Sequence, residues 1–98
     1  MKLLTKEIKR RLPELYKQEG IKDPMVYVKY FTPWGNWTWY GMEFDGEDTF
    51  FGYVLGNEKE LGYFNLSELE NATGPLGLKI ERDLYFTPTK LSEIKKHK

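Results

Sequence analysis

The residues best suited to carry chemistry in this chain are aromatic rings, and they are concentrated in one part of it. The stretch "NWTWYGMEF", residues 36–44, contains two tryptophans, a tyrosine, a methionine and a phenylalanine. Thirteen of the sixteen aromatic residues lie between Tyr27 and Phe64. Such rings are usually buried in a core, but tryptophan and tyrosine also form exposed surfaces on which nucleobases stack. The pattern alone leaves both interpretations open.

Few side chains suited to catalysis accompany these rings. The chain has no cysteine, which excludes a thiolate nucleophile and a thiolate metal site. Its one histidine, His97, stands among lysines near the end of the sequence, which argues against a Ser-His-Asp triad and a histidine-rich zinc site. The stretch "GPLG" indicates the end of a helix rather than a phosphate-binding loop. We therefore expect a non-enzymatic protein without a cofactor.

Acidic residues cluster in "EFDGED", which contributes Glu43, Asp45, Glu47 and Asp48. Clustered oxygen ligands can bind Ca²⁺ or Mg²⁺. Their spacing does not match a calcium-binding loop, and aspartate with glycine is typical of a hairpin turn. We expect a turn and no metal site. A pair of carboxylates that hydrolyses a glycosidic bond is a weaker alternative, because any chain with fifteen acidic residues offers such pairs.

The formal net charge is zero, but the charges are unevenly distributed. Residues 1–22 carry seven basic and three acidic side chains, residues 23–75 two and nine, and residues 76–98 six and three. Solvated helix faces and a basic tail account for this pattern most simply. The alternative is a basic patch assembled from both ends of the chain.

Length and composition suit one globular domain, residues 1–98. No apolar run approaches the roughly 20 residues that span a bilayer. The start "MKLL" resembles a signal peptide, but charged residues from Lys6 to Arg10 interrupt the apolar stretch, so no secretory signal is expected. The absence of cysteine favours a cytoplasmic protein, because small secreted domains often need disulfides.

Hydrophobic periodicity predicts a short helix near the start of the chain. Apolar residues recur at spacings of three and four, which places on one helical face Leu4, Ile8, Leu12, Leu15 and Tyr16. Thr5 is a suitable N-cap, and the helix is expected to end near Arg11. Pro13 predicts a kink or a second helical turn, which Gly20 ends.

An antiparallel meander follows. The β-branched and aromatic runs expected to form strands are residues 25–31, 36–44, 49–55 and 61–64, joined by the turns "TPWGN", "DGED" and "GNEKE". Side-chain alternation makes both faces partly apolar: in the second strand, one face carries Thr38, Tyr40, Met42 and Phe44, and the other Trp37, Trp39, Gly41 and Glu43. Helices covering both faces are the simpler explanation, with Tyr40 and Val28 in the core. An exposed aromatic face is the alternative, because the helices are few and short.

The rest of the chain predicts short helices around an irregular segment. In "NLSELENATG", Asn65 is a suitable N-cap with Glu68 as its capping-box partner, and Gly74 is expected to end the helix. Residues 82–86 are a candidate fifth strand, and residues 89–98 form a final helix or tail anchored by Leu91 and Ile94. The predicted fold class is α+β, an antiparallel four- to five-stranded meander sheet packed with short helices.

Several stretches occur in the order and spacing of a known bacterial family. They are "LLTKEIKRRLPELY", "VKYFTPWGNWTWY", "FFGYVLGNEKELGYF", "LSELE", "GPLGLKIERDLYF" and "LSEI". Over nearly its whole length the chain resembles the DUF2958 family, although it departs at "GMEFDGED", where many relatives look longer. The resemblance implies a small bacterial protein of plasmids, phages and conjugative elements, with an accessory role in DNA transfer or in evading host defence. It implies no catalytic residues.

Two hypotheses for the function follow from the rings, the charges and the resemblance. The first is a non-enzymatic binding module for nucleic acid, preferably single-stranded, with bases on the rings and phosphates near the cations. The residues assigned to this site are Trp34, Trp37, Trp39, Lys9, Arg10, Arg11 and Lys29. The second is a protein-interaction or inhibitor module that presents the same aromatic surface to a host defence protein. The near-neutral net charge counts against strong binding to duplex DNA.

Overall fold

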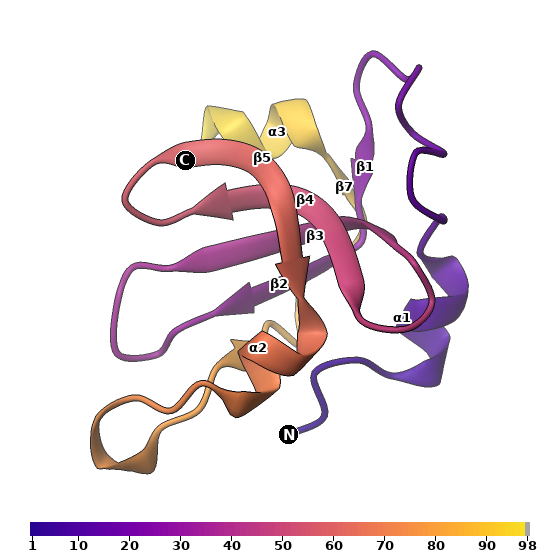
Figure 1. The fold of residues 1–98 in the computed structure, drawn as a ribbon. Helices are drawn as coiled ribbons and strands as arrows, with labels where there is room; N and C mark the ends of the chain where they lie inside the picture. The colour runs from indigo at the N-terminus through magenta and orange to yellow at the C-terminus, as the bar shows by residue number, and fades with distance from the viewer. Residues whose placement is uncertain (98) are drawn as a thin grey trace.

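The computed structural model describes residues 1–97, and in that range it contains three short α-helices, seven β-strands and one 3₁₀ helix (Figure 1). In chain order they are α1 (Lys6–Arg11), β1 (Met25–Val26), β2 (Val28–Phe31), β3 (Thr38–Phe44), β4 (Thr49–Leu55), β5 (Lys59–Asn65), α2 (Leu66–Asn71), η1 (Pro75–Gly77), β6 (Glu81–Arg82), β7 (Thr89–Lys90) and α3 (Leu91–Lys96). Five strands form one antiparallel sheet in the order β5-β4-β3-β2-β6, and β1 pairs with β7. The predicted α+β fold, an antiparallel sheet packed with short helices, is confirmed.

The first predicted strand, residues 25–31, is divided at Tyr27. Its second half, β2, pairs with β3 in the central sheet. Its first half, β1, turns away and pairs with β7, so that Met25 lies opposite Lys90. The partner of β1 comes from the far end of the chain, and the local sequence pattern therefore did not indicate the break.

The hairpin strands follow the sequence prediction, with one extension. β3 starts two residues later than expected, and β4 occupies the predicted residues 49–55. β5 is longer than the predicted strand 61–64 because the preceding turn is tight. The Gly56 backbone N–H donates to the Glu58 carbonyl at 3.0 Å, and pairing with β4 already starts at Lys59. Charged residues assigned to the turn therefore begin the outermost strand of the sheet.

The first helix is confirmed. Thr5 caps α1 by accepting the backbone N–H of Ile8 at 3.2 Å. The helix ends at Arg11, and Leu12 has an extended backbone (φ −70°, ψ 123°). This conformation is the one that a residue before proline prefers, so Pro13 ends the helix as its position indicated.

The predicted turn after Pro13 forms but does not continue as a helix: the Lys17 N–H donates to the Glu14 carbonyl and the Glu19 N–H to the Tyr16 carbonyl, each at 3.2 Å. Residues 15–20 form turns, and Tyr16 has a left-handed backbone with φ 71°. The backbone of this segment is also joined to β3, beginning with the Phe44 N–H, which donates to the Pro13 carbonyl at 2.9 Å. These bonds join distant parts of the chain, and a local apolar spacing does not indicate them.

The second helix begins as predicted but ends earlier. The Asn65 backbone N–H donates to the Glu68 carboxylate at 3.2 Å, which completes the predicted capping box. The helix ends at Asn71 rather than at Gly74, because Ala72 is already extended (φ −68°, ψ 135°).

The last part of the chain supplies a short fifth strand and a helix. β6 contains only Glu81–Arg82, so most of the predicted strand 82–86 is irregular. α3 is anchored by the buried residues Leu91 and Ile94, as predicted. Lys98, the last residue of the predicted tail, lies outside the described residues. Among the helices of residues 1–97, none has the length and apolar character needed to cross a membrane.

A β-bulge in β3 changes which side chains share a face. Pairing with β4 shifts by one residue between Gly41 and Glu43, which leaves Met42 as the extra residue. Tyr40 remains with Met42 on one face, whereas Phe44 belongs to the core on the opposite face. The prediction that all three share a face was wrong, because strict alternation assumes a strand without a bulge.

Both faces of the sheet are packed against other elements. One, which we call the α2 face, buries Leu3, Leu12, Val28, Tyr30, Phe44, Phe50, Phe64, Leu69 and Ile80. The other, the α3 face, buries Val26, Tyr40, Met42, Tyr53, Leu91 and Ile94. The predicted core residues Tyr40 and Val28 are each 2% exposed, on opposite faces. The aromatic row of β3 is therefore mainly core.

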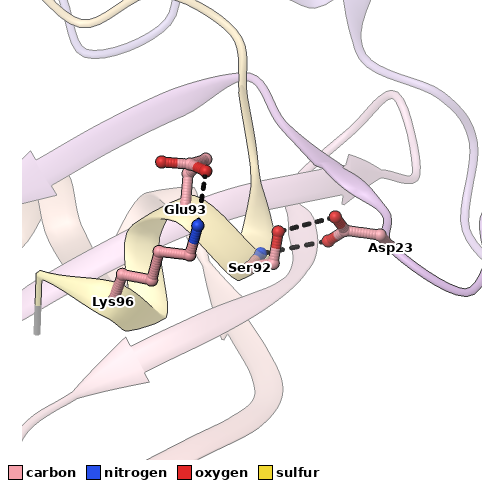
Figure 2. Close-up of polar contacts among 4 residues, drawn as sticks. All are labelled: Asp23, Ser92, Glu93 and Lys96. Carbon is pink, nitrogen blue, oxygen red and sulfur yellow. Dashed lines mark hydrogen bonds and ion pairs between the residues drawn. The ribbon is translucent and has the colours of Figure 1, made fainter.

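Two helices begin with the same kind of cap, supplied from another part of the chain. At the start of α2, the Asp48 carboxylate accepts the Ser67 backbone N–H at 2.8 Å and the Ser67 hydroxyl at 2.7 Å. At the start of α3, the Asp23 carboxylate accepts the Ser92 backbone N–H at 3.0 Å and its hydroxyl at 2.6 Å (Figure 2). Each aspartate thereby fixes a helix against one face of the sheet.

Candidate binding site

The three tryptophans gather at one end of the α2 face, around the turn between β2 and β3. The rings of Trp37 and Trp39 stack with their centroids 5.8 Å apart and their planes at 26°. Trp34 packs against Gly74 and Trp37 against Gly56, where a Cβ would collide with the indole. The absence of a side chain at Gly74 and Gly56 therefore leaves the space that the rings of Trp34 and Trp37 occupy. Trp37 is 41% exposed, whereas Trp34 and Trp39 are partly buried against the core.

A hollow of about 510 Å³ lies between these rings and α2, and we call it the tryptophan groove. It is lined by Thr32, Trp34, Trp37, Trp39, Val54, Glu60, Gly62, Tyr63, Phe64, Glu68, Leu69, Ala72 and Ile80. Gly62 contributes to its depth, because a Cβ at this position would meet no atom within 4 Å. A side chain there would occupy the groove rather than the core.

The tryptophan groove has an acidic rim. Within residues 1–97, the only charged side chains that line it are those of Glu60 and Glu68. Glu60 is exposed on β5, and Glu68 is exposed on α2, where its carboxylate also accepts the Asn65 N–H. Aromatic faces attract cations through the ring quadrupole, and carboxylates attract them through charge. The groove therefore suits a cationic ligand better than an anionic one.

The predicted cations of the first helix are not brought to the tryptophans. Lys9, Arg10 and Arg11 lie on α1, at the end of the sheet away from the turn between β2 and β3 (Figure 1). Arg11 also forms a 2.7 Å ion pair with Glu7 on the same helix. The basic cluster and the tryptophan groove are thus separate surfaces.

Lys29, the remaining predicted cation, approaches a tryptophan only in a different hollow. Its Nζ lies 3.6 Å from the Asp83 carboxylate. Together with Trp37 it lines a hollow of about 610 Å³ that also includes Glu81 and Arg82. The two basic and two acidic side chains that line this hollow balance one another in charge.

A third hollow, of about 480 Å³, lies on the α3 face, and we call it the tyrosine groove. Four large apolar side chains around it are exposed, namely Tyr16 (64%), Ile21 (51%), Leu61 (48%) and Tyr63 (56%). The exposed charged residues that line it are of both signs: Glu19, Lys22 and Lys95. Tyr63 also borders the tryptophan groove, so β5 runs between the two.

A buried carboxylate builds the tyrosine groove. Glu43, which is 4% exposed, accepts the backbone N–H groups of Tyr16 at 2.9 Å and of Gln18 at 2.8 Å. These bonds hold Tyr16 in the left-handed conformation, which tyrosine rarely adopts. The buried Gln18 amide bonds in turn to the backbone of Met25 and Met42. Buried hydrogen bonds thus hold the loop, and the Tyr16 ring remains exposed to solvent.

The two tyrosines of this groove contact each other. The Tyr63 hydroxyl donates to the Tyr16 hydroxyl at 3.5 Å. This hydrogen bond, followed by desolvation, raises the pKa of Tyr63 above its ordinary value. The Tyr63 phenol is therefore neutral at physiological pH, and the two rings present an apolar surface with polar hydroxyl tips.

A family model described as a protein of unknown function, DUF2958, matches residues 3–96. The chain belongs to the DUF2958 family. The resemblance inferred from the motifs is confirmed, and the family description assigns no activity. The curated proteins and the solved structures that were compared gave no match.

In this DUF2958 protein the acidic turn serves the fold. The Asp45 carboxylate accepts the backbone N–H groups of Glu47, Asp48 and Thr49 at 2.8, 2.9 and 3.0 Å. These three bonds lower the pKa of Asp45 below its ordinary value. In the part of the chain that the structure describes, no three histidine, cysteine, aspartate or glutamate side chains are grouped as metal ligands would be.

The sequence identified the tryptophans of the tryptophan groove but not the other residues that line it. The tryptophans were named, but Glu60 and Glu68 were assigned to a turn and a helix cap. Gly62 offered a signal, because glycine inside a strand often marks an open or closely approached position. The tyrosine groove had no comparable signal, since the bond from Tyr16 to Glu43 spans 27 residues.

Proposed function

We propose that this protein is a non-enzymatic binding module whose tryptophan groove holds a positively charged segment of another protein. The observation that carries the proposal is the pairing of three indoles with two carboxylates in a groove that no cation of residues 1–97 lines. Arginine or lysine of a partner would stack on an indole face and pair with Glu60 or Glu68.

The same observation weakens the hypothesis of single-stranded nucleic acid. Stacked bases bring phosphates with them, and binding requires cations close to the rings. Here the carboxylates of Glu60 and Glu68 stand beside the rings, and Lys9, Arg10 and Arg11 lie on another surface. In the mobile-element setting that the family resemblance implies, we take a host protein as the partner.

The test is fluorescence anisotropy with three labelled probes at low salt: a peptide alternating valine and arginine, its counterpart alternating valine and glutamate, and oligothymidine. Only the basic peptide is expected to bind. Trp37→Ala should weaken binding about tenfold or more, as loss of an aromatic anchor does. Glu60→Gln and Glu68→Gln should each weaken it about two- to fivefold, the range of an exposed ion pair.

Glu70→Gln is the matched control, because Glu70 is exposed on the same helix as Glu68 and does not line the tryptophan groove. It should leave the affinity unchanged. Glutamine at position 68 preserves the capping box, so α2 stays intact. Binding of oligothymidine that Trp37→Ala weakens, without binding of the basic peptide, would overturn the proposal in favour of nucleic acid.

A further inference from the structure

We propose that the partner segment binds as an additional β-strand along the free edge of β5, with alternate side chains in the two grooves. This inference rests on the proposed function and specifies how the tryptophan groove is filled. Strand addition supplies affinity through main-chain hydrogen bonds and specificity through pockets for alternate side chains.

The outer edge of β5 is available for pairing. β5 is the end strand of the sheet, and among residues 1–97 its only strand partner is β4. The Leu66 N–H donates to the Asp48 carbonyl at 2.8 Å, which sets the alternation along β5. Even-numbered residues direct their backbone groups to β4, and Leu61 and Tyr63 direct theirs outward. The next outward N–H, that of Asn65, is already bonded to Glu68, so the open edge ends there.

Charged residues, Lys59 and Glu60, stand at the start of this edge, but its middle lacks the devices that usually protect an exposed strand. Natural edges are commonly short, charged, interrupted by proline or covered. The opposite edge of the sheet follows this rule, because β6 contains only two residues. β5 contains seven, and its middle presents Leu61, Gly62 and Tyr63, of which the two large side chains are about half exposed.

The two grooves define the chemistry of the added strand. Side chains alternate across a strand, so residues opposite Leu61 and Tyr63 would lie over the tyrosine groove. The large exposed side chains of that surface are apolar, and its exposed charged residues are of both signs. Residues opposite Glu60 and Gly62 would lie on the side of the tryptophan groove, and a long side chain could cross Gly62, where no Cβ obstructs it. The expected partner therefore alternates apolar residues with arginine or lysine.

A second copy of this chain is a poorer occupant. Antiparallel pairing of β5 with itself about Gly62 would set Leu61 opposite Tyr63, which is favourable. It would also bring Glu60 and Glu68 of both copies to the same side of the joined sheet, where like charges oppose pairing. The charges thus favour a basic segment of another protein.

Backbone N-methylation of the valine–arginine peptide tests the inference. In an antiparallel added strand, the residues opposite Leu61 and Tyr63 donate their N–H groups to β5. Methylation of the backbone nitrogen of every valine should therefore weaken binding about tenfold or more. Methylation of the backbone nitrogen of every arginine should be tolerated. The reverse selectivity would indicate a parallel strand and would also support strand addition. Equal effects, or none, would overturn it.

A protein variant tests the same edge. Leu61→Pro removes an outward N–H at a position where an edge strand tolerates proline, and Leu61→Ala removes the side chain alone. The proline variant should lose binding at least tenfold more than the alanine variant, with both variants folded by circular dichroism. If the peptide binds and Trp37→Ala weakens it, but Leu61→Pro and N-methylation have no effect, strand addition fails while the proposed function stands.

Size-exclusion chromatography with light scattering completes the test. The wild-type chain is expected to be a monomer at micromolar concentration. A dimer that Leu61→Pro converts to a monomer would assign the edge to a second copy and overturn the inference.

Discussion

The tryptophan groove and the tyrosine groove lie on opposite faces of the same strand, yet they are built differently. Rings from one hairpin form the first, and its depth comes from a missing side chain at Gly62. The second depends on Glu43, which holds a loop more than twenty residues away in the sequence. A surface made from neighbouring residues is visible in a sequence, and one made by a distant buried contact is not.

The largest effect is expected from the cores beneath the two grooves. Val28→Ala on the α2 face and Tyr40→Ala on the α3 face should each lower the free energy of unfolding by about 2–5 kcal/mol, because both side chains are buried and truncation leaves a cavity. Urea denaturation measures this loss. An unchanged midpoint for either variant would mean that its face contributes little to stability.

Removal of the Glu43 carboxylate should disturb the tyrosine groove and leave the tryptophan groove unchanged. Glu43→Ala leaves the N–H groups of Tyr16 and Gln18 without their acceptor, at a cost of about 2–3 kcal/mol in unfolding free energy. Hydrogen exchange of residues 14–22 should accelerate, and tryptophan emission should stay unchanged. Glu47→Ala, an exposed acid in the next turn, is the control and should change stability by less than about 0.5 kcal/mol. Equal exchange rates in Glu43→Ala and wild type would contradict the prediction.

Filling the tryptophan groove should affect binding far more than stability. Gly62→Val places a side chain where no atom lies within 4 Å, and valine favours strands, so unfolding free energy should change by less than about 1 kcal/mol. Binding of the valine–arginine peptide should be lost. Gly52→Val, at the directly opposite position in β4, is the contrast, because its Cβ would collide with the Tyr40 carbonyl. If the Gly62→Val variant bound the peptide as tightly as the wild type does, the peptide would not occupy the tryptophan groove.

The smallest effect concerns the cap that holds α3 beside the tyrosine groove. Hydrogen bonds from the Ser92 hydroxyl and backbone N–H lower the pKa of Asp23 in the folded state. Its contribution to stability is therefore present above the unfolded pKa of about 3.9 and is lost as pH falls through the lower folded pKa. The difference in urea midpoint between wild type and Asp23→Asn should shrink as pH falls through this range. Glu93→Gln, on the same helix outside this cap, controls for the change in charge. If the difference in urea midpoint between wild type and Asp23→Asn stayed constant with pH, the cap would not be the cause of that difference.

The sequence predicted what short-range rules govern. Thr5 and the capping box at Asn65 indicated two helix starts, and glycine with aspartate indicated the hairpin turns. Strict alternation failed in β3, because the bulge at Met42 depends on pairing with β4. The candidate site was predicted only in part, because local sequence patterns do not indicate contacts between distant segments. The indoles of one hairpin were recognisable, whereas their acidic neighbours come from β5 and α2, which only folding brings beside them.

The pairing of Met25 with Lys90 also fixes the order in which a growing chain can complete its two faces. Synthesis proceeds from the N-terminus, and elements fold as their partners emerge. The α2 face draws its covering helices from residues up to 71, so most of it can assemble early. The α3 face waits for Leu91 and Ile94. Until Leu91 and Ile94 have been synthesised, Tyr40, Met42 and Tyr53 lack this cover, and the growing chain presents an apolar surface of the kind that chaperones bind.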